Sequence, residues 1–526
     1  MKKIQVWLPL LFAIVMIVGM RIGYKLRENI PASQGFFNKA NRSSLQEVVD
    51  LVDRRYVDPV NTDTLTGDAV QAMLSHLDPH SIYIPAMHLS EVNEDLQGNF
   101  EGIGVEFLII DDTVNVTNVS AGGPSDKAGL QVGDKFIKVG DSIVAGNIDS
   151  DKIKKLLRGN GGSSVTVTLL RNGKSVPVSI TRGTIPLYSV DASYMIDKES
   201  GIIHVNKFSG TTYREFMQAL EKLQAQGLKK LILDLRGNGG GILGEAVGIS
   251  DEFLDEDKLI VYTEGDKQKR VDYRSKRPGL LETGKLVVLV DEGSASASEV
   301  VAGALQDWDR ATIIGRRTFG KGLVQEQYNL SDGSALRLTV ARYYTPTGRS
   351  IQKSYSNGRD AYNDEVIERF HNGEVVHSDT VKSVPGKAYK TPGGRTVYGG
   401  GGITPDIFVP FDTASYSSTL GALFYDNRFS KFIYGYYIRN QNYFRQFKDP
   451  SDFLNGFNKT EEIWKSLDEY MNKNNVHIET LSARDKDELK KRIKTWMARQ
   501  MWRMQGYYQV SNRYDNAVMK ALEELK

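Results

Sequence analysis

The spacing of apolar residues changes along the chain and divides it into regions of different predicted structure. Residues 36–97 place apolar side chains at helical intervals, as in "SLQEVVDLVDRRYVD", and predict a helical N-terminal part. Between residues 98 and 182 the period becomes two, as in "SVTVTLL", and Asn172-Gly173 is typical of a hairpin turn. This second region predicts a small module of strands with one or two short helices.

Residues 183–410 alternate short apolar strands with amphipathic helices. "GIIHVNKF" precedes "TYREFMQALEKLQAQG", "LKKLILDL" precedes "ILGEAVGISDEFL", and "KLVVLV" precedes "SEVVAGALQDW". Such alternation predicts an α/β layer with substantially parallel strands. Residues 411–526 are rich in aromatic side chains and helical in pattern, and their tyrosines are expected to pack between helices. The predicted fold class is multidomain α/β and α+β, with a partly parallel sheet, an inserted β/α module and a helical C-terminal extension.

The first 25 residues stand apart because they contain an uncharged apolar run. Lys2 and Lys3 precede this run, which extends from Ile4 to Met20 and lies at the short end of the range that spans a membrane. No small-residue cleavage site follows it, so a signal anchor is favoured over a cleaved signal peptide. The two lysines favour an N-terminus on the cytoplasmic side of the membrane, with the rest of the chain on the outer side. The protein is therefore expected to be exported and membrane-anchored in the cell envelope, on the periplasmic side of the inner membrane.

Charge and cysteine content argue against several classes of protein. Lysine plus arginine number 67 and aspartate plus glutamate 65, so the net charge of +2 argues against nucleic-acid binding through bulk positive charge. The chain has no cysteine and hence no disulfide, thiolate nucleophile or cysteine-bound metal. Its seven histidines show no HExxH or paired metal spacing. We therefore expect neither a metal site nor a cofactor.

Two glycine-rich segments approach the patterns of nucleotide-binding loops. Gly239–Gly244 fits GxGxxG between a strand and a helix, but four glycines in six residues match that pattern easily. The segment "GRRTFGKG", residues 315–322, differs from the phosphate-loop pattern at one position, its last. However, the strand-like "LVQEQYNL" follows it where a helix should begin. We reject the phosphate loop and keep a dinucleotide enzyme as a weaker alternative.

Three serines alternate in "GSASASE", between the apolar run "KLVVLV" and an amphipathic helix. A serine at such a strand-to-helix turn exposes its hydroxyl near the positive end of the helix, although a serine-rich N-cap explains the same letters. A nucleophilic serine needs a base, and Lys321 is a candidate if desolvation keeps it neutral. Gln325, four residues further on, is expected to orient the lysine amine.

The motifs "LDPHSIY", "DLRGNGGG", "SASASE", "TFGKGLVQ" and "GGITPDI" together resemble those of the carboxy-terminal processing peptidases, or tail-specific proteases. The resemblance covers roughly residues 40–410 and implies a serine protease with an inserted PDZ domain. It implies that Ser296 is the nucleophile, Lys321 the general base and Gln325 the residue that positions the lysine. Ser294 and Ser298 are then structural or capping residues.

The same resemblance implies an oxyanion hole and a site for substrate tails. The oxyanion hole would use the backbone N–H of Ala297 and one from the glycine-rich loop, at Gly240 or Gly241. The module at residues 98–182 resembles a PDZ domain, whose loop "GIGVEF" receives a C-terminal carboxylate. The N–H groups that would bind this carboxylate belong to Gly102, Ile103, Gly104 and Val105.

The expected domain order follows from the patterns and the resemblance. Residues 1–25 are the signal anchor or signal peptide, 36–97 the helical start of the protease, 98–182 the PDZ domain, 183–410 the serine protease core and 411–526 the helical extension. Arg182, which ends the module, is either an interdomain contact or a solvated hinge residue. The extension falls outside the resemblance, which leaves open whether it packs on the protease, forms a homo-oligomer or binds an adaptor.

The function that these features favour is endoproteolysis. The expected enzyme is a serine endopeptidase that cleaves exported proteins near their C-termini, with a Ser-Lys-Gln set and PDZ-mediated capture of the substrate tail. Its expected partners are polypeptides with free C-terminal tails and the membrane, through the N-terminal segment, but not nucleic acid. The alternative is a catalytically inactive PDZ scaffold.

Overall fold

The computed structural model describes residues 13, 15–21, 44–146, 149–377, 386–413, 418–425 and 427–526. Most of the expected anchor, residues 1–25, lies outside these residues. Within them, no helix combines the length and the apolar character that crossing a membrane requires. The chain forms two compact units, residues 1–73 and 74–526. The first contains helix α2 (Ser44–Arg55), and helix α3 (Thr62–Ser75) ends at the start of the second.

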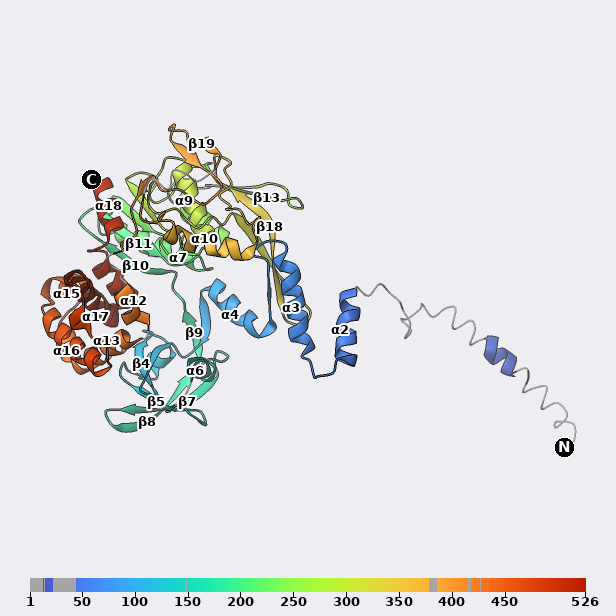
Figure 1. Cartoon of the computed structure of the whole chain (residues 1–526), viewed down its shortest axis with the longest axis horizontal. Coiled ribbons are helices and arrows are strands. Elements are labelled where there is room, and N and C mark those ends of the chain that lie inside the picture. The colour runs from blue at the N-terminus through green and yellow to red at the C-terminus, as the bar shows by residue number, and fades with distance from the viewer. Residues whose placement is uncertain are drawn as a thin grey trace. The chain divides into compact units, whose positions relative to one another are not determined.

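A six-stranded sheet forms the centre of the second unit, as the alternating strands and helices predict (Figure 1). Four of its neighbouring pairs are parallel and one edge pair is antiparallel. In spatial order its strands are β10 (Val190–Met195), β11 (Ser200–Val205), β12 (Lys230–Asp234), β15 (Leu286–Val290), β16 (Thr312–Gly315) and β21 (Ile407–Phe408). Every residue of β11 and β15 is buried, which explains their continuous apolar sequences.

Helices cover both faces of this sheet. Alternate residues such as Ile203, Leu233 and Val288 pack on one face against α7 (Thr212–Gln224), α8 (Leu243–Asp251) and α9 (Ala297–Asp307). The intervening residues, including Ile232 and Leu289, pack on the other face against α18 (Asn516–Glu524). The C-terminal extension therefore contributes part of the central core, so packing on the protease, one of the roles that the sequence left open, is observed.

A second, antiparallel sheet lies beside the first and carries the loops that follow the serine turn. Strand β18 (Ala335–Tyr344) pairs with β1 (Ile82–Ile84), β13 (Leu259–Glu264) and β17 (Leu323–Asn329), and β14 (Val271–Arg274) pairs with β13. Strand β1 comes from the motif "LDPHSIY", which is therefore joined to a strand more than 200 residues later. Helices α4 (Ala86–Gln97) and α10 (Arg359–His371) and the hairpin of β19 (Ala388–Lys390) and β20 (Thr396–Tyr398) complete this part.

The inserted module is a five-stranded sheet with a small extra strand and two helices. Its strands are β3 (Val105–Ile110), β4 (Thr113–Val119), β5 (Lys135–Val139), β7 (Ser164–Arg171) and β8 (Lys174–Thr181), with β6 (Ser142–Ile143) beside β5. Its helices are α5 (Pro124–Lys127) and α6 (Ser150–Leu157). Strands β2 (Asn99–Gly102) and β9 (Gly183–Pro186) pair antiparallel where the chain enters and leaves the module.

Two local features of the module are a tight hairpin and an arginine that caps a helix. The predicted hairpin at Asn172-Gly173 is confirmed, because β7 and β8 meet there and both residues have positive φ angles of 49° and 77°. Arg182 is neither an interdomain contact nor a solvated hinge residue, the two roles that the sequence left open. Its guanidinium donates to the carbonyl oxygens of Leu156 (3.0 Å) and Leu157 (2.9 Å), so it caps the end of α6 inside the module.

The C-terminal extension is helical, as predicted, and its core is largely aromatic. Its helices before α18 are α12 (Ser418–Tyr425), α13 (Arg428–Arg439), α14 (Gln441–Phe444), α15 (Pro450–Gly456), α16 (Thr460–Lys473) and α17 (Ala483–Ser511). Phe453 stands at the centre of this core, with ring centroids of Phe447 at 5.2 Å and of Phe457 at 4.5 Å. Some tyrosines of this region pack between helices, as expected; Tyr436, for example, is buried and lies against Phe432 and Phe444.

Candidate active site

The turn between β15 and α9 holds its central serine in a conformation that L-residues rarely adopt. Ser296 has φ 55° and ψ −112° and immediately precedes the first residue of α9. Such a backbone conformation costs about 1–3 kcal/mol and persists only where its surroundings enforce it. A hydrogen bond from Ala295 N–H to the carbonyl of Asn238 (2.9 Å) fixes the turn against the glycine-rich loop. The arrangement is that of a strained strand-to-helix turn that presents a hydroxyl.

The three alternating serines have different surroundings. Ser294 Oγ donates to the carbonyl oxygen of Leu235 (2.8 Å), and Ser298 Oγ donates to that of Asn238 (2.9 Å). Both residues are fully buried, whereas Ser296 is partly exposed. The outer two hydroxyls are thus used to fasten the turn to the neighbouring loop, and the middle one is left at the surface of the site.

Glu299 is the residue that joins the serine turn to the loop containing Lys321. Its carboxylate accepts four hydrogen bonds, from the N–H groups of Ser296 (2.8 Å), Gly320 (2.7 Å) and Lys321 (2.8 Å) and from the hydroxyl of Thr318 (2.5 Å). Burial raises the pKa of Glu299 to about 7, against the opposing effect of these donors. Glu299 is not among the residues expected from the sequence, although a glutamate three residues after a serine at a helix start is the pattern of a capping box.

Tyr343 makes a second link between the same two segments. Its buried hydroxyl lies within hydrogen-bond distance of the carbonyl oxygens of Ser296 (3.0 Å) and Lys321. One hydroxyl proton is shared between these two acceptors. The backbones at positions 296 and 321, which are 25 residues apart, are therefore held together by two buried side chains.

Lys321 lies in a setting that disfavours its charged form. It follows Gly320 in the loop before β17, and burial lowers the pKa of its amine, as does the charge of Arg337. The negative charges of Glu299 and Asp78 act in the opposite direction on this pKa without reversing the shift. A lowered pKa increases the neutral fraction of the amine at a given pH, and the neutral amine is the form that can accept a proton.

Gln325 has a different hydrogen-bond partner from the one expected. Its Nε2 donates to Thr339 Oγ1 (3.3 Å), which donates in turn to Asp78 Oδ1 (3.0 Å). An irregularity between Val324 and Gln325 interrupts the alternation on which the expectation of a shared face with Lys321 rested. The contacts of the described residues include no hydrogen bond between Gln325 and the Lys321 amine, so its positioning role stays a prediction.

The motif "LDPHSIY" lies close enough to Lys321 for the charge of its Asp78 to affect the pKa of the lysine. Asp78 accepts hydrogen bonds from the N–H groups of His80 (2.8 Å) and Ser81 (2.9 Å) as well as from Thr339. His80 Nε2 lies 2.8 Å from the hydroxyl of Tyr362. Burial, followed by the charge of Lys321, lowers the pKa of His80 to about 4, so its ring is neutral.

The glycine-rich loop lies directly against the serine turn. Gly240 has φ 94°, and a Cβ atom there would be 2.6 Å from the carbonyl oxygen of Ala295 and 2.9 Å from the nitrogen of Ala297. The Gly240 N–H already donates to Asn238 Oδ1 (2.8 Å), which favours Gly241 of the two candidate oxyanion donors. The N–H of Ala297 is the first of α9 and has no acceptor within the helix.

The same geometry argues against a dinucleotide site in this loop. Such a site needs its second glycine to face the pyrophosphate. Here the space beside Gly240 is filled by Ala295 and Ser296, and Phe208 lies against Gly241 through a backbone bridge. Within the described ranges, no group of three or more histidine, aspartate or glutamate residues is placed to hold a metal ion.

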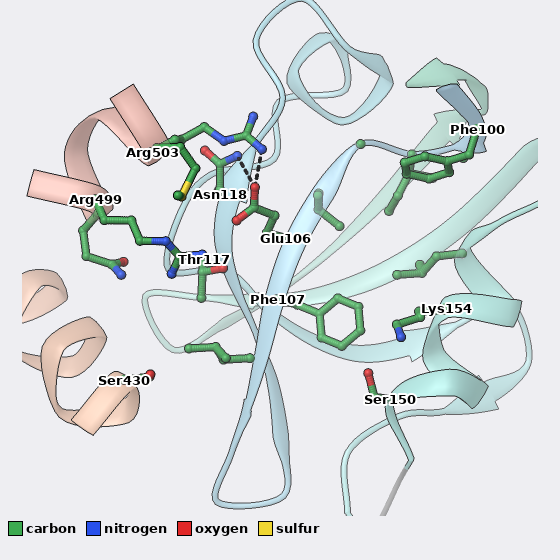
Figure 2. Close-up of a pocket in the computed structure, with 18 of the residues that line it drawn as sticks. Phe100, Glu106, Phe107, Thr117, Asn118, Ser150, Lys154, Ser430, Arg499 and Arg503 are labelled. Carbon is green, nitrogen blue, oxygen red and sulfur yellow. Dashed lines mark hydrogen bonds and ion pairs between the residues drawn. The ribbon is translucent and has the colours of Figure 1, made fainter. Parts of the chain in front are cut away.

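The four residues of the predicted carboxylate loop lie together at the inserted module. Gly102, Ile103, Gly104 and Val105 span the end of β2 and the start of β3, and all four line a cavity of about 580 Å³ (Figure 2). Helix α6 forms another part of its lining. β3 is the edge strand of the module, so its outer edge is available for pairing with an extended peptide.

Comparisons with known proteins agree with the motifs in the sequence. The family model described as "Peptidase family S41" matches residues 199–360, that for the "PDZ domain" matches 102–181, and a "Family of unknown function (DUF8443)" matches 419–503. A "Probable CtpA-like serine protease" from Staphylococcus epidermidis is 35% identical over 316 residues, covering 60% of this chain and 64% of the relative. The chain thus spans less than two thirds of the length of this curated relative.

Two solved structures are also similar. The photosystem II D1 C-terminal processing protease has 31% sequence identity, and the match covers 58% of this chain and 89% of that chain with a TM-score of 0.34. The PDZ domain of the carboxy-terminal protease from Vibrio cholerae, solved in complex with a peptide, has 32% identity. That match covers 17% of this chain and 99% of the other, with a TM-score of 0.16.

Replacing Gly240 with alanine is expected to disrupt the serine turn. The new Cβ would overlap the turn backbone, and alanine disfavours the φ angle of 94°. Displacing a reactive group by about 1 Å can cost ~10²-fold in rate, so labelling of Ser296 by a fluorophosphonate probe should slow to that extent. Gly239→Ala is the matched control, because no heavy atom lies within 4 Å of a Cβ there. Equal labelling of the two variants would contradict the assignment.

Proposed function

We propose that this chain, which matches the family model of peptidase family S41 at residues 199–360 and that of the PDZ domain at residues 102–181, is a serine endopeptidase that cleaves exported proteins near their C-termini. The observation that carries this proposal is the strained turn that leaves Ser296 partly exposed while Glu299 ties it to the loop of Lys321. The lowered pKa of Lys321 supports its role as the base. An inactive PDZ scaffold would need none of these features.

In the proposed reaction, neutral Lys321 takes the proton of Ser296 as the serine oxygen attacks the scissile carbonyl carbon. The carbonyl oxygen becomes an oxyanion that accepts hydrogen bonds from the N–H groups of Ala297 and Gly241. Each such donor is worth about 3–4 kcal/mol in the transition state. The tetrahedral intermediate then collapses, the C–N bond breaks, and protonated Lys321 gives its proton to the leaving amine.

Water completes the cycle. Neutral Lys321 deprotonates a water molecule, which attacks the ester carbonyl of the acyl-enzyme. As the second intermediate collapses and the C–O bond breaks, protonated Lys321 gives this proton to Ser296 Oγ. In this proposal Gln325 positions the lysine, and Glu299 and Tyr343 hold the two backbones at a fixed separation. Ser294 and Ser298 support the turn through their hydrogen bonds to the neighbouring loop.

The PDZ domain is proposed to capture the substrate by its C-terminal tail. The terminal carboxylate would bind the N–H groups at Gly102–Val105, and the tail would add as a strand along β3. Tethering one end of a polypeptide raises the effective concentration of its scissile bond at Ser296. The substrate class is therefore polypeptides with a free and extended C-terminus.

We also propose that the protein is exported and anchored in the cell membrane by residues 1–25. Lys2 and Lys3 before the apolar run, and the lack of a small-residue cleavage site after it, support this location on the periplasmic side of the inner membrane.

Ser296→Ala is expected to abolish cleavage of an unstructured test polypeptide, and Lys321→Met to do the same. Removing one member of a catalytic pair lowers kcat by roughly 10⁴-fold or more. Cleavage is followed by gel and mass spectrometry, and tail-peptide binding of the Ser296→Ala variant should be unchanged. Ser354→Ala, an exposed serine, is the matched control. A Ser296→Ala variant that cleaves normally would refute the assignment, and a wild-type chain that cleaves nothing would favour the scaffold.

The dependence of activity on pH should report the pKa of Lys321. Activity rises as the amine loses its proton, and the positive charge of Arg337 favours that loss by lowering this pKa. Arg337→Gln should therefore raise the pKa of Lys321 and move the acidic limb of the kcat/KM profile to higher pH. Arg337→Lys keeps the charge and should leave the limb in place. An unshifted limb in Arg337→Gln, with activity otherwise intact, would remove Lys321 as the titrating base.

The anchor is tested by N-terminal sequencing of the mature protein from membranes of an expressing bacterium. An uncleaved anchor predicts a sequence that begins before Gly23 and a protein that stays with the membrane after a wash at high salt. A mature protein that starts after Gly23 would show instead that the segment is a signal peptide.

A further inference from the structure

The cavity at the PDZ carboxylate loop has a second wall, which the C-terminal extension supplies. Besides β3 and α6, the cavity is lined by Trp496, Arg499 and Arg503 from α17 and by Ser430 from α13 (Figure 2). The buried hydroxyl of Tyr434 donates to the carbonyl oxygen of Val116 in β4 (3.1 Å) and docks α13 on the module. The proposed tail-binding site is therefore built from the inserted module and the C-terminal extension. Addition of a peptide strand to a PDZ sheet requires only the module.

Strand β3 presents different side chains to the two walls. Val105, Phe107 and Ile109 pack against the core of the module. The register of β3 on β4 shifts between Glu106 and Phe107, and Glu106 and Leu108 also line the cavity. Figure 2 shows Glu106 directed toward Arg503, on the side of the C-terminal helices, and Phe107 directed toward α6.

The wall formed by α17 is positively charged, and its charge is only partly compensated. Arg503 forms an ion pair with Glu106, which also accepts a hydrogen bond from Asn118 (3.4 Å). The Arg499 guanidinium lies over the ring of Trp496 at 5.0 Å, and in the part of the chain that the structure describes it pairs with no carboxylate. Two arginines thus face this side of the cavity with a single acidic partner.

The backbone of α17 is bent at Trp502 and Arg503. Trp502 and Arg503 have non-helical angles, with φ 54° and ψ −141° at Arg503. The break brings Gly506 so close to Ala498 that a Cβ atom there would lie 2.6 Å from the Ala498 carbonyl oxygen. A positive φ at a non-glycine residue is costly and is often retained where it directs a side chain into a site.

We infer that the C-terminal extension makes the tail site selective for substrates with acidic residues at positions −1 and −3, counting the last residue as 0. This inference rests on the proposed capture of tails along β3. In an added strand the side chain of residue 0 would enter the apolar side at Ile103 and Phe107, as would that of residue −2. Residues −1 and −3 would face the side of Glu106, where Arg499 and Arg503 lie.

The proposed selectivity depends on pairing between acidic side chains of the tail and the arginines of α17. A carboxylate of the tail would pair with Arg499 directly and would compete with Glu106 for Arg503. Glu106 therefore limits which tails gain affinity from Arg503. A neutral tail leaves the ion pair between Glu106 and Arg503 intact and gains nothing from Arg503. The proposed ligand for the part of the cavity beside Arg499 and Arg503 is thus the acidic end of a polypeptide, and not a basic or an apolar tail.

The test compares two ten-residue peptides that differ only in having aspartate or alanine at −1 and −3. Binding is measured by fluorescence anisotropy on the full chain carrying Ser296→Ala, which prevents the proposed cleavage. The acidic peptide should bind about fivefold more tightly or better, and 1 M salt should reduce the difference. Arg499→Gln combined with Arg503→Gln should bring the two affinities together, whereas Arg445→Gln, on the exposed surface of the same extension, should not.

Glu106→Gln supplies a change in the opposite direction. It frees Arg503, so the acidic peptide should bind more tightly than to the parent chain, a result that a misfolded variant cannot give. Equal binding of both peptides to the parent, or a preference that survives the double arginine variant, would overturn the inference and leave tail capture standing. Equal binding of a peptide with an amidated C-terminus, or no binding of either tail, would overturn tail capture and this inference with it.

Discussion

The geometry of the candidate site depends on one buried carboxylate. Glu299 has no contact with solvent and compensates for its burial with four hydrogen bonds, three of them from backbone N–H groups. Leaving such a donor unpaired in the interior costs about 1–3 kcal/mol, whereas a typical hydrogen bond contributes about 0.5–1.5 kcal/mol. The start of α9 and the loop before β17 are therefore fixed relative to each other as one piece. The unfavourable angles of Ser296 are maintained by that connection, together with the fastening of Ser294 and Ser298 to the glycine-rich loop.

Much of the fold follows from signals that act over short stretches of sequence. Apolar strands before amphipathic helices are sufficient for the parallel sheet, since a strand covered on both faces has to be apolar at every position. Asn172-Gly173 is sufficient for its hairpin because both residues tolerate positive φ angles. The turn of Ser296 also has a local signature, in which small residues separate a buried strand from a helix.

What the sequence could not supply are the pairings over long distances. Glu299 and Tyr343 look like ordinary members of a helix and a strand until the fold brings the loop of Lys321 to them. At Gln325 the register of the strand is irregular, which its sequence does not reveal, and the side-chain amide donates to Thr339. The link from Asp78 to Thr339 joins residues 261 apart, and no local pattern indicates it.

The position of α18 has a consequence for the order in which the protein is made. The sheet residues Ile232 and Leu289 are covered on one face by Val518 and Ala521, which the ribosome adds more than 200 residues later. Until then this face has no covering from α18, and exposed strand surfaces of this kind promote aggregation. A chain without α18 would therefore leave Ile232 and Leu289 without this cover on one face of the sheet.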